Sequence, residues 1–410
     1  MALSERSKSG VKPCDSAWSV FLVFLRLGLT SFGGPIAHLG YFREAFVARR
    51  QWLSERSYAE LVALCQLLPG PASSQVGIAL GLSRAGFAGA VAAWAGFTLP
   101  SALILVLCAQ GLATWGDATP SGLLHGLKIV AVAVVAQAVW GMARSLCTDA
   151  ARVTIALLAA CTALLWPNAI GQIAVMVGSA IAGLMLPQQP RSPAGEGLPF
   201  SVSRKAGLAA LVLFFVLLVG LPLLTRIWPS PALAMVNAFY SAGSLVFGGG
   251  HVVLPLLESA TVPTGWVATN TFLAGYGLAQ AVPGPLFTFA AFLGASMSVQ
   301  PSGWVGATVG ILAIFTPSFL LVIGVLPLWG KLRHSARSQS ALAGVNAGVV
   351  GLLLAALYQP VWTSAIVKPA DFAWALIALM ALMFWRMPPW LVVLGCGLFG
   401  WLLNPTQTSG

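Results

Sequence analysis

Acidic residues are scarce in this chain of 410 residues, which has 10 Asp and Glu against 21 Lys and Arg. Charged residues together make up only 8%, hydrophobic residues make up 58%, and the mean hydropathy is +0.88. A soluble globule of this size needs more polar residues to cover its surface. The composition therefore excludes a soluble globular protein and predicts an all-α polytopic membrane protein, because helices satisfy their own backbone hydrogen bonds in lipid.

Motifs of enzymes, metal sites and nucleic-acid binding are also missing. The six cysteines include no Cys-x-x-Cys pair and the four histidines show no ligand spacing, so neither a disulfide framework nor a metal site is predicted. There is no P-loop and no nucleophile with a base at a useful spacing, so we expect no enzyme and no cofactor. The net charge of +11 comes from scattered basic residues, not from a basic run, so nucleic acid is not an expected partner.

Nine apolar stretches have about the 20 residues that a membrane-spanning helix needs. They lie at 86–111, 122–143, 151–166, 168–187, 206–225, 303–328, 340–359, 371–386 and 389–404. Four further apolar stretches carry Gly-Gly or Pro-Gly-Pro near their middles, at 18–46, 58–83, 236–257 and 271–298. Such a break frees backbone groups at membrane depth, which is tolerated only beside protein or a water-filled cavity. We therefore predict four broken or re-entrant helices.

The four breaks form two pairs that are about 215 residues apart, with Phe32 matching Phe247 and Pro69 matching Pro283. The chain thus reads as two repeats joined by one extra helix, and an odd helix between two even-numbered repeats inverts the second. The predicted domains are an N-terminal tail at 1–17, a first repeat at 18–187, a linker with a transmembrane helix at 188–230, an inverted repeat at 231–404 and a C-terminal tail at 405–410.

Loop charges predict the orientation. Four arginines lie in the loop 43–56, whereas its counterpart 258–271 has no Lys or Arg, and this difference is reversed between the loop 111–121 and the basic loop after Trp329. Cytoplasmic loops are enriched in Lys and Arg. The loop 43–56 is therefore expected in the cytoplasm and the C-terminus in the periplasm, and the reversal is what inverted repeats require.

These motifs resemble those of the chromate ion transporter family. The resemblance runs from Trp18 to Leu403 and is carried by Arg26-Leu27-Gly28, Ser31-Phe32-Gly33-Gly34-Pro35-Ile36-Ala37-His38, Leu68-Pro69-Gly70-Pro71, Phe247-Gly248-Gly249-Gly250-His251 and Val282-Pro283-Gly284-Pro285. It implies a long two-repeat bacterial member that exports chromate across the inner membrane, gives chromate resistance and is driven by the membrane potential or the proton motive force.

Two alternatives remain at this point: a transporter of sulfate or another oxyanion with the same architecture, and, more distantly, a membrane scaffold without transport. The expected partners are chromate, or sulfate in the first alternative, and the lipid bilayer. A homo-oligomer is left open.

Chromate is a tetrahedral dianion, so its site needs converging donors and positive potential, which the N-termini of half-helices supply. We therefore expect the substrate to bind at the glycine breaks, at the Pro-Gly-Pro segments and at the turns beside them. These residues are Ser31, Phe32, Gly33, Gly34, Pro69, Gly70, Pro71, Ser73, Ser74, Ser244, Phe247, Gly248, Gly249, Gly250, Pro283, Gly284, Pro285 and Thr288. The alternative interpretation is that these glycines and prolines only permit kinks and close helix crossings.

Two basic residues in apolar sequence, and the residue that matches one of them in the other repeat, complete the expected substrate site. Arg26 lies in the first broken segment, and Lys128 corresponds to Asn346 in the other repeat. A buried arginine costs at least about 2.5 kcal/mol in the centre of a membrane helix, so we expect it to have a function, with the dianion as its partner. The alternatives for Arg26 are an ion pair with Glu44 or Glu60, or snorkelling to the cytoplasmic face.

Four titratable residues near the breaks are candidates for carrying coupling protons: His38, His251, Glu60 and Glu258. For the two histidines the alternative is a packed, hydrogen-bonded side chain. For the two glutamates it is a place in an interfacial loop.

Overall fold

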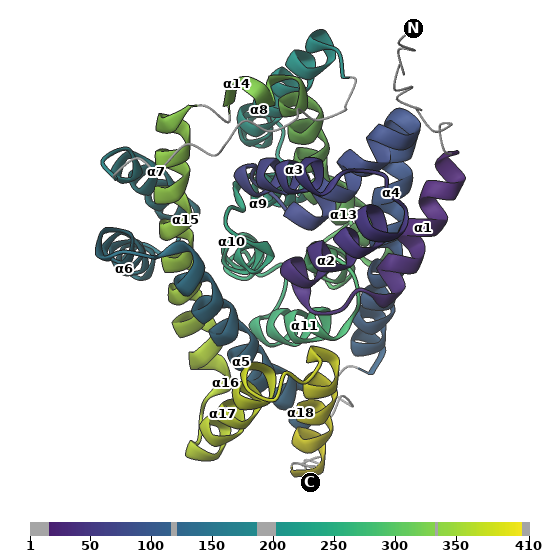
Figure 1. The fold of residues 1–410 in the computed structure, drawn as a ribbon. Helices are drawn as coiled ribbons and strands as arrows, with labels where there is room; N and C mark the ends of the chain where they lie inside the picture. Colours follow the sequence, from purple (N-terminus) through teal and green to yellow (C-terminus); the bar gives the residue numbers. More distant parts are fainter. Residues whose placement is uncertain (1–15, 116–120, 187–201, 333–334, 404–410) are drawn as a thin grey trace, which may run out of the picture.

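The computed structural model describes residues 16–115, 121–186, 202–332 and 335–403, and these residues form helices and turns but no strand. Five of the helices are long and apolar enough to cross a membrane: Ala72–Thr114, Gly122–Leu146, Arg204–Ile227, Gly303–Leu328 and Arg337–Ala365. Large apolar side chains remain exposed, above all on α8 (Arg204–Ile227), where lipid would cover them. The predicted all-helical polytopic architecture is confirmed (Figure 1).

Four of the nine predicted spans form helices that are too short to be full spans. The helices α6 (Ala150–Leu165) and α7 (Ala169–Leu184) have 16 residues each, and α17 (Pro369–Met383) and α18 (Pro389–Leu403) have 15 each. At 1.5 Å per residue such a helix is about 24 Å long, less than the roughly 30 Å of a hydrocarbon core. The predicted stretches 151–166, 371–386 and 389–404 already had only 16 residues each, so the expectation of about 20 residues was wrong for them.

Both predicted breaks in the first half are present. The first apolar segment forms α1 (Ala17–Thr30) and α2 (Gly34–Arg43), which the π-helical turn η1 (Glu44–Arg49) extends. The second forms α3 (Glu55–Leu67) and α4 (Ala72–Trp115). The backbone of α4 is not helical at Ala85 and Gly86, so residues 72–84 form a short helix of their own before the span.

The second half repeats this pattern with shorter pieces. The third broken segment of the chain consists of α9 (Pro231–Leu245), the 3-10 turn η3 (Gly250–Val252) and α10 (Val253–Thr261). The fourth broken segment consists of α11 (Thr269–Ala281), the 3-10 turn η4 (Leu286–Thr288) and α12 (Phe289–Ala295). The span α13 (Gly303–Val325) follows, and it continues through η5 (Leu326–Leu328) into α14 (Trp329–Leu332).

The two halves of the chain exchange helix pairs. The pair α6 and α7 packs against α15 (Ala336–Ala356), and the pair α17 and α18 packs against α5 (Ser121–Leu146) (Figure 1). Glycines at matching positions allow this close approach, since a Cβ at Gly126 would overlap the carbonyl oxygen of Cys396 and a Cβ at Gly344 would overlap that of Ser179. Beyond α15 the chain forms η6 (Leu357–Trp362) and α16 (Thr363–Ala365).

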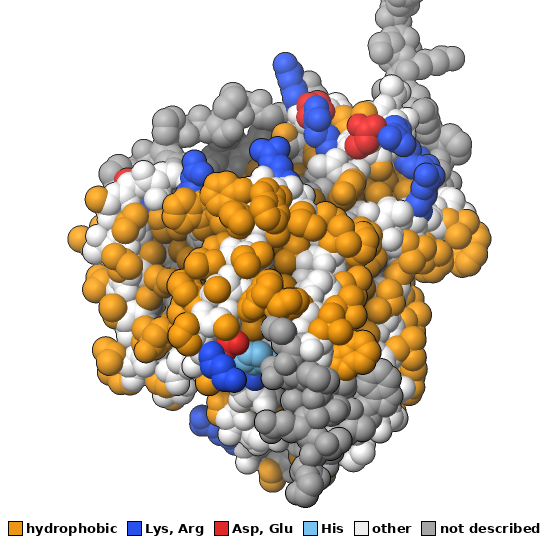
Figure 2. All heavy atoms as spheres, turned by 90° about the horizontal axis from the view of Figure 1, so that it is seen from below, with side chains coloured by type: hydrophobic (Ala, Val, Ile, Leu, Met, Phe, Trp, Pro, Cys, Tyr) orange, Lys and Arg blue, Asp and Glu red, His pale blue; other side chains and the backbone are white. Residues whose placement is uncertain are grey.

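The broken helices α2, α3, α9, α10 and α11 lie in the middle of the molecule as seen in Figure 1. Around them stand the longer helices and the exchanged pairs. Figure 2 shows charged side chains gathered along one edge of a broad apolar band, with a smaller charged group at the opposite border. This distribution is what a bilayer across the apolar band would select.

Candidate functional site

Two glycine-containing breaks end α1 and α9. After α1, Gly33 and Gly34 have φ angles of 98° and 78°, and after α9, Gly248 and Gly249 have φ angles of 74° and 150°. Glycine adopts these conformations at no steric cost, so these residues set the directions in which α2 and α10 leave the break. Pro35 occupies the first turn of α2, where its missing N–H costs no hydrogen bond.

The Pro-Gly-Pro segments form the other two breaks. Gly70 has a φ angle of 121° and Gly284 one of 105°. The residues before them, Leu68 and Val282, are extended, as expected for a residue that precedes proline. Each segment therefore stops one helix, and the next helical element begins after an interruption of four residues.

The breaks of the two halves are joined by two backbone hydrogen bonds. The amide of Gly70 donates to the carbonyl oxygen of Val246, at 2.6 Å, and the amide of Gly284 donates to that of Ser31, at 2.9 Å. Ser31 and Val246 occupy matching places, directly after α1 and α9. Each Pro-Gly-Pro segment thus meets the glycine break of the other half, and we call this meeting point of the four breaks the crossing.

Side chains from α4 and α13 close the crossing in the same reciprocal way. A Cβ on Gly70 would lie 2.6 Å from Nε2 of Gln75 and 2.7 Å from Oγ of Ser318, which belongs to α13 in the other half. A Cβ on Gly284 would lie 2.8 Å from Oγ of Ser101, in α4. Both glycines are therefore required by their φ angles and by the space around them.

Buried polar side chains surround the crossing. Ser31, Ser74, Gln75, Thr98 and Ser318 are each at most 2% exposed. Within the part of the chain that the structure describes, their Oγ, Oε1 or Oγ1 atoms have no hydrogen-bond partner, although Nε2 of Gln75 donates to the carbonyl oxygen of Pro69. Buried polar atoms are rarely left without partners, and those that are need an explanation such as a missing ligand, ion or water.

Other predicted polar residues of the crossing have partners inside the protein. Oγ1 of Thr288 donates to the carbonyl oxygen of Pro285, at 2.7 Å, and Oγ of Ser244 donates to that of Tyr240, at 2.8 Å. Ser73 lies 3.4 Å from Nδ1 of His38. These hydroxyls keep acceptor capacity, but their protons are already committed or shared.

The two histidines beside the glycine breaks are hydrogen-bonded. Nε2 of His38 lies 3.2 Å from the carbonyl oxygen of Ser31, so His38 braces the first break, and its side chain is 1% exposed. Nδ1 of His251 lies 2.9 Å from the hydroxyl of Tyr276. Both contacts agree with the interpretation of packed, hydrogen-bonded histidines.

Arg26 is exposed, so the expectation that it is buried was wrong. The buried face of α1 carries Val20, Phe24 and Gly28, and Arg26 lies on the opposite side of the helix. The side chain of Arg26 has no hydrogen bond or ion pair to any described residue, whereas Glu44 pairs with Arg49 at 2.8 Å. The predicted alternative of an Arg26–Glu44 pair is thus also wrong, and Arg26 is free to meet a ligand from outside.

The remaining predicted residues lie at other places. Nζ of Lys128 donates to Oδ1 of Asn270 at the start of α11, at 3.2 Å. Asn346, in α15, has a buried Oδ1 without a partner among the described residues. Oε1 of Glu60 accepts from Nε1 of Trp329, at 3.0 Å, and Glu258 lines a separate cavity.

Sequence reasoning missed three polar residues of the crossing, namely Thr98, Ser101 and Ser318. Ser101 and Ser318 each follow a proline, Pro100 and Pro317, at matching positions of α4 and α13. A polar residue that follows a proline at the same position of both repeats is a pattern from which Ser101 and Ser318 could have been predicted.

Interrupted helices that meet in the centre of a helical bundle, around buried polar groups, are typical of secondary transporters. The fold and the site thus define a polytopic helical membrane transporter. The chain belongs to the chromate transporter family, whose model matches residues 18–184 and again residues 233–401.

Individual relatives agree with this assignment. The chain is 28% identical over 429 residues to a chromate transport protein of Pseudomonas aeruginosa, covering 98% of this chain and 96% of that one. It is 27% identical to a probable chromate transport protein of Synechococcus elongatus, covering 85% of each. The chain is also 28% identical to the uncharacterized transporter YwrA of Bacillus subtilis, and this match covers 41% of this chain and 94% of YwrA. No solved structure matches the chain.

Proposed function

We propose that this chain is a secondary transporter that exports chromate from the bacterial cytoplasm across the inner membrane and so confers chromate resistance. Membership of the family and the names of its relatives support chromate as the substrate. The observation that carries the transport path is the crossing, where Gly70 and Gly284 join the breaks of the two halves. Transport of sulfate, which has nearly the same shape and charge, is the alternative.

The chemistry of the crossing suits a tetrahedral dianion. The hydroxyls of Ser31, Ser74 and Ser318 have no partner within the described ranges and are available to donate to oxyanion oxygens. The short helices that begin at the breaks add N–H groups and the positive ends of their dipoles. None of the buried polar residues that surround the crossing is acidic, so no carboxylate repels the anion there.

The crossing is closed in this structure, because its unpartnered polar side chains are at most 2% exposed. An anion reaches it only when the breaks of the two halves separate. The hydrogen bonds from Gly70 to Val246 and from Gly284 to Ser31 are the contacts that such a movement would exchange. Two equivalent contacts, one from each half, are what alternating access between related repeats would use.

We propose Arg26 as the residue that draws the anion toward the crossing. Arg26 lies nine residues after the start of α1, or about 14 Å along the helix, which is near the middle of a hydrocarbon core of roughly 30 Å. Thr30 is exposed one turn further on and the buried Ser31 follows it, so polar groups lead from Arg26 to the break. A charge at this depth is stable only against water or an anion.

The proposed orientation places loop 43–56 in the cytoplasm and loop 258–271 in the periplasm, with the two repeats inverted. The reversed distribution of basic residues in the loops supports it. Single cysteines placed in the two loops should react with a membrane-impermeant maleimide from opposite sides. Labelling of both loops from the same side would contradict inversion.

The membrane potential is large enough to drive this export. Moving two negative charges outward gains about 4.6 kcal/mol per 100 mV, inside negative, at about 2.3 kcal/mol per charge. At about 1.4 kcal/mol per tenfold, this supports a chromate gradient of roughly a thousandfold. Obligatory proton coupling is therefore not needed energetically.

Uptake of radioactive chromate into everted membrane vesicles tests the proposed function. Vesicles that contain this chain should accumulate chromate, and excess unlabelled chromate should reduce the uptake more than an equal excess of sulfate. Stronger reduction by sulfate would assign the chain to sulfate transport. Uptake no greater than in vesicles without the chain would contradict transport of either anion.

A further inference from the structure

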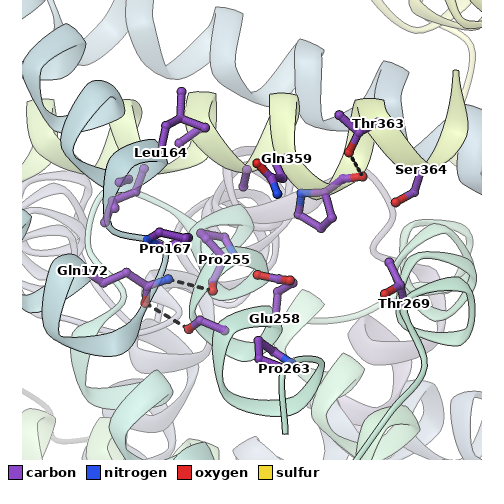
Figure 3. Close-up of a pocket in the computed structure, with 16 residues that line it drawn as sticks. Leu164, Pro167, Gln172, Pro255, Glu258, Pro263, Thr269, Gln359, Thr363 and Ser364 are labelled. Atoms are coloured by element: carbon purple, nitrogen blue, oxygen red, sulfur yellow. Dashed lines mark hydrogen bonds between the residues drawn. The ribbon is translucent and has the colours of Figure 1, made fainter. Parts of the chain in front are cut away.

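A cavity of about 410 Å³ lies apart from the crossing, between α10, α7 and the irregular segment η6. Figure 3 shows the carboxyl group of Glu258 pointing into this cavity, with Gln359 on the other side. The other polar lining residues are Gln172, Ser259, Thr269, Thr363 and Ser364. The cavity is large enough to hold several water molecules.

Glu258 is the one titratable residue that lines the cavity, and its carboxyl group forms no hydrogen bond or ion pair with the rest of the described chain. It lies in the last turn of α10, outside the helices that are long enough to cross the membrane. Burial raises the pKa of Glu258 to about 7, because a desolvated carboxylate is disfavoured.

The elements packed against α10 bring no charge to this carboxyl group. The helix α7 has no titratable residue, and the titratable residues on α9, η3, η6 and α15 are Tyr240, His251, Tyr358 and Arg337. None of them lines the cavity. The protonation of Glu258 is therefore governed by the cavity itself.

The helix α10 connects the cavity to the crossing. Its η3 turn begins at Gly250, directly after the glycine break, and Glu258 is eight residues further on, or about 12 Å along the helix. Gln172 of α7 binds α10 with both ends of its amide, because Nε2 donates to the carbonyl oxygen of Pro255, at 3.1 Å, and Oε1 accepts from Ser259, at 3.2 Å. A charge on Glu258 is thus held at a fixed distance from the proposed path.

We propose that this cavity is a proton-binding pocket reached from the periplasm, that Glu258 is its proton-binding residue, and that its protonation speeds the exit of chromate. The inference rests on the proposed function and orientation, in which loop 258–271 faces outward. An ionised Glu258 repels the dianion, whereas a protonated one does not. For effective dielectric constants between about 80 and 20, repulsion at about 12 Å slows the anion by roughly threefold to a hundredfold.

The test uses the purified full chain in proteoliposomes with the potential clamped. Chromate efflux is measured while the pH on the periplasmic side of the protein is varied. The pH on the cytoplasmic side is held constant. Efflux by the wild type should fall by at least about threefold as the external pH rises through 7, because Glu258 loses its proton there. Glu258→Gln has no charge at any pH, so its efflux should stay at the low-pH rate.

Glu55→Gln is the matched control, since Glu55 lies on the opposite, cytoplasmic side and pairs with Arg43 at the surface. It should keep the wild-type pH profile. A Glu258→Gln variant with the wild-type profile would overturn the proposal. A profile that depends on sodium, shown by replacing sodium with choline, would assign the pocket to a metal cation and overturn the proton assignment.

A second readout does not depend on transport. Carbodiimides react with protonated carboxyl groups, so peptide mass spectrometry should find Glu258 labelled at low pH, with labelling that falls near pH 7. No labelling above about pH 6, where an unperturbed glutamate is already ionised, would overturn the proton site. If the wild type carried no chromate at any pH, the proposed function would fail, and the labelling would still decide whether Glu258 binds a proton.

Discussion

Replacing either Gly70 or Gly284 with alanine should reduce chromate flux per folded molecule by more than about tenfold. Their φ angles of 121° and 105° disfavour any residue with a Cβ, which costs about 1–3 kcal/mol for each substitution. The new Cβ would also lie 2.6 Å from Gln75 at one crossing contact and 2.8 Å from Ser101 at the other. The amide that bonds to Val246 or Ser31 would be displaced, and with it the alignment of the breaks.

Gly141→Ala is the matched control for these two variants. Gly141 lies within α5, and a Cβ there meets no atom within 4 Å, so the substitution should be neutral or should stabilise the helix by up to about 1 kcal/mol. Membrane abundance, detergent-solubilised monodispersity and flux are measured on the same preparations. Normal flux in Gly70→Ala and Gly284→Ala would show that the crossing does not have to keep this geometry during transport.

The double variant Gly284→Ala with Ser101→Ala separates the steric contact from the backbone strain. It removes the Oγ atom nearest to the new Cβ but leaves the φ angle unchanged. Partial recovery of folded protein is expected relative to Gly284→Ala alone. No recovery would mean that the φ angle, or the next contact at 3.2 Å to the carbonyl oxygen of Phe97, accounts for the loss.

Arg26→Ala should lower chromate flux by more than about tenfold while leaving the amount of folded protein unchanged. The second part follows from the structure, because Arg26 is exposed and no described carboxylate would be left without its partner. Arg26→Lys should recover only part of the flux, since a point charge replaces a planar group that matches two oxyanion oxygens. Normal flux per folded molecule in Arg26→Ala would exclude Arg26 as a ligand on the path.

Leu22→Ala is the control for Arg26, because Leu22 lies one turn earlier on an exposed part of α1. It should leave both flux and yield near the wild-type values. If Arg26→Ala lowered yield as well as flux, Arg26 would have a structural role that no contact in the described chain explains.

The positions of the breaks could be predicted from sequence, because Gly-Gly and Pro-Gly-Pro act locally on the backbone. The helix ends at Thr30, Leu67, Leu245 and Ala281 all fall where these residues interrupt the pattern. The bounds of α6, α7, α17 and α18 lie within three residues of the predicted stretches, so these helices could be located from sequence, although they are shorter than the roughly 20 residues of a full span.

The partners within the candidate site could not be predicted. The contact between Gly70 and Val246 joins residues far apart in the chain, and no local pattern specifies such a pairing. The exposure of Arg26 depends on which face of α1 packs against α4. Because α1 has apolar residues on both faces, its sequence does not indicate which face is packed. The cavity at Glu258 is assembled from both halves of the chain, so the sequence near Glu258 gave no sign of it.

We expect this chain to carry chromate outward as a charged species under the membrane potential. The measurement that tests it most directly is chromate flux through the purified protein in liposomes whose potential is clamped by potassium and valinomycin, with equal pH on both sides. We expect the flux to run toward the positive side and to support about a thousandfold chromate gradient at 100 mV, as two charges per anion require. Flux that ignores the potential and appears only with a pH gradient would contradict this account.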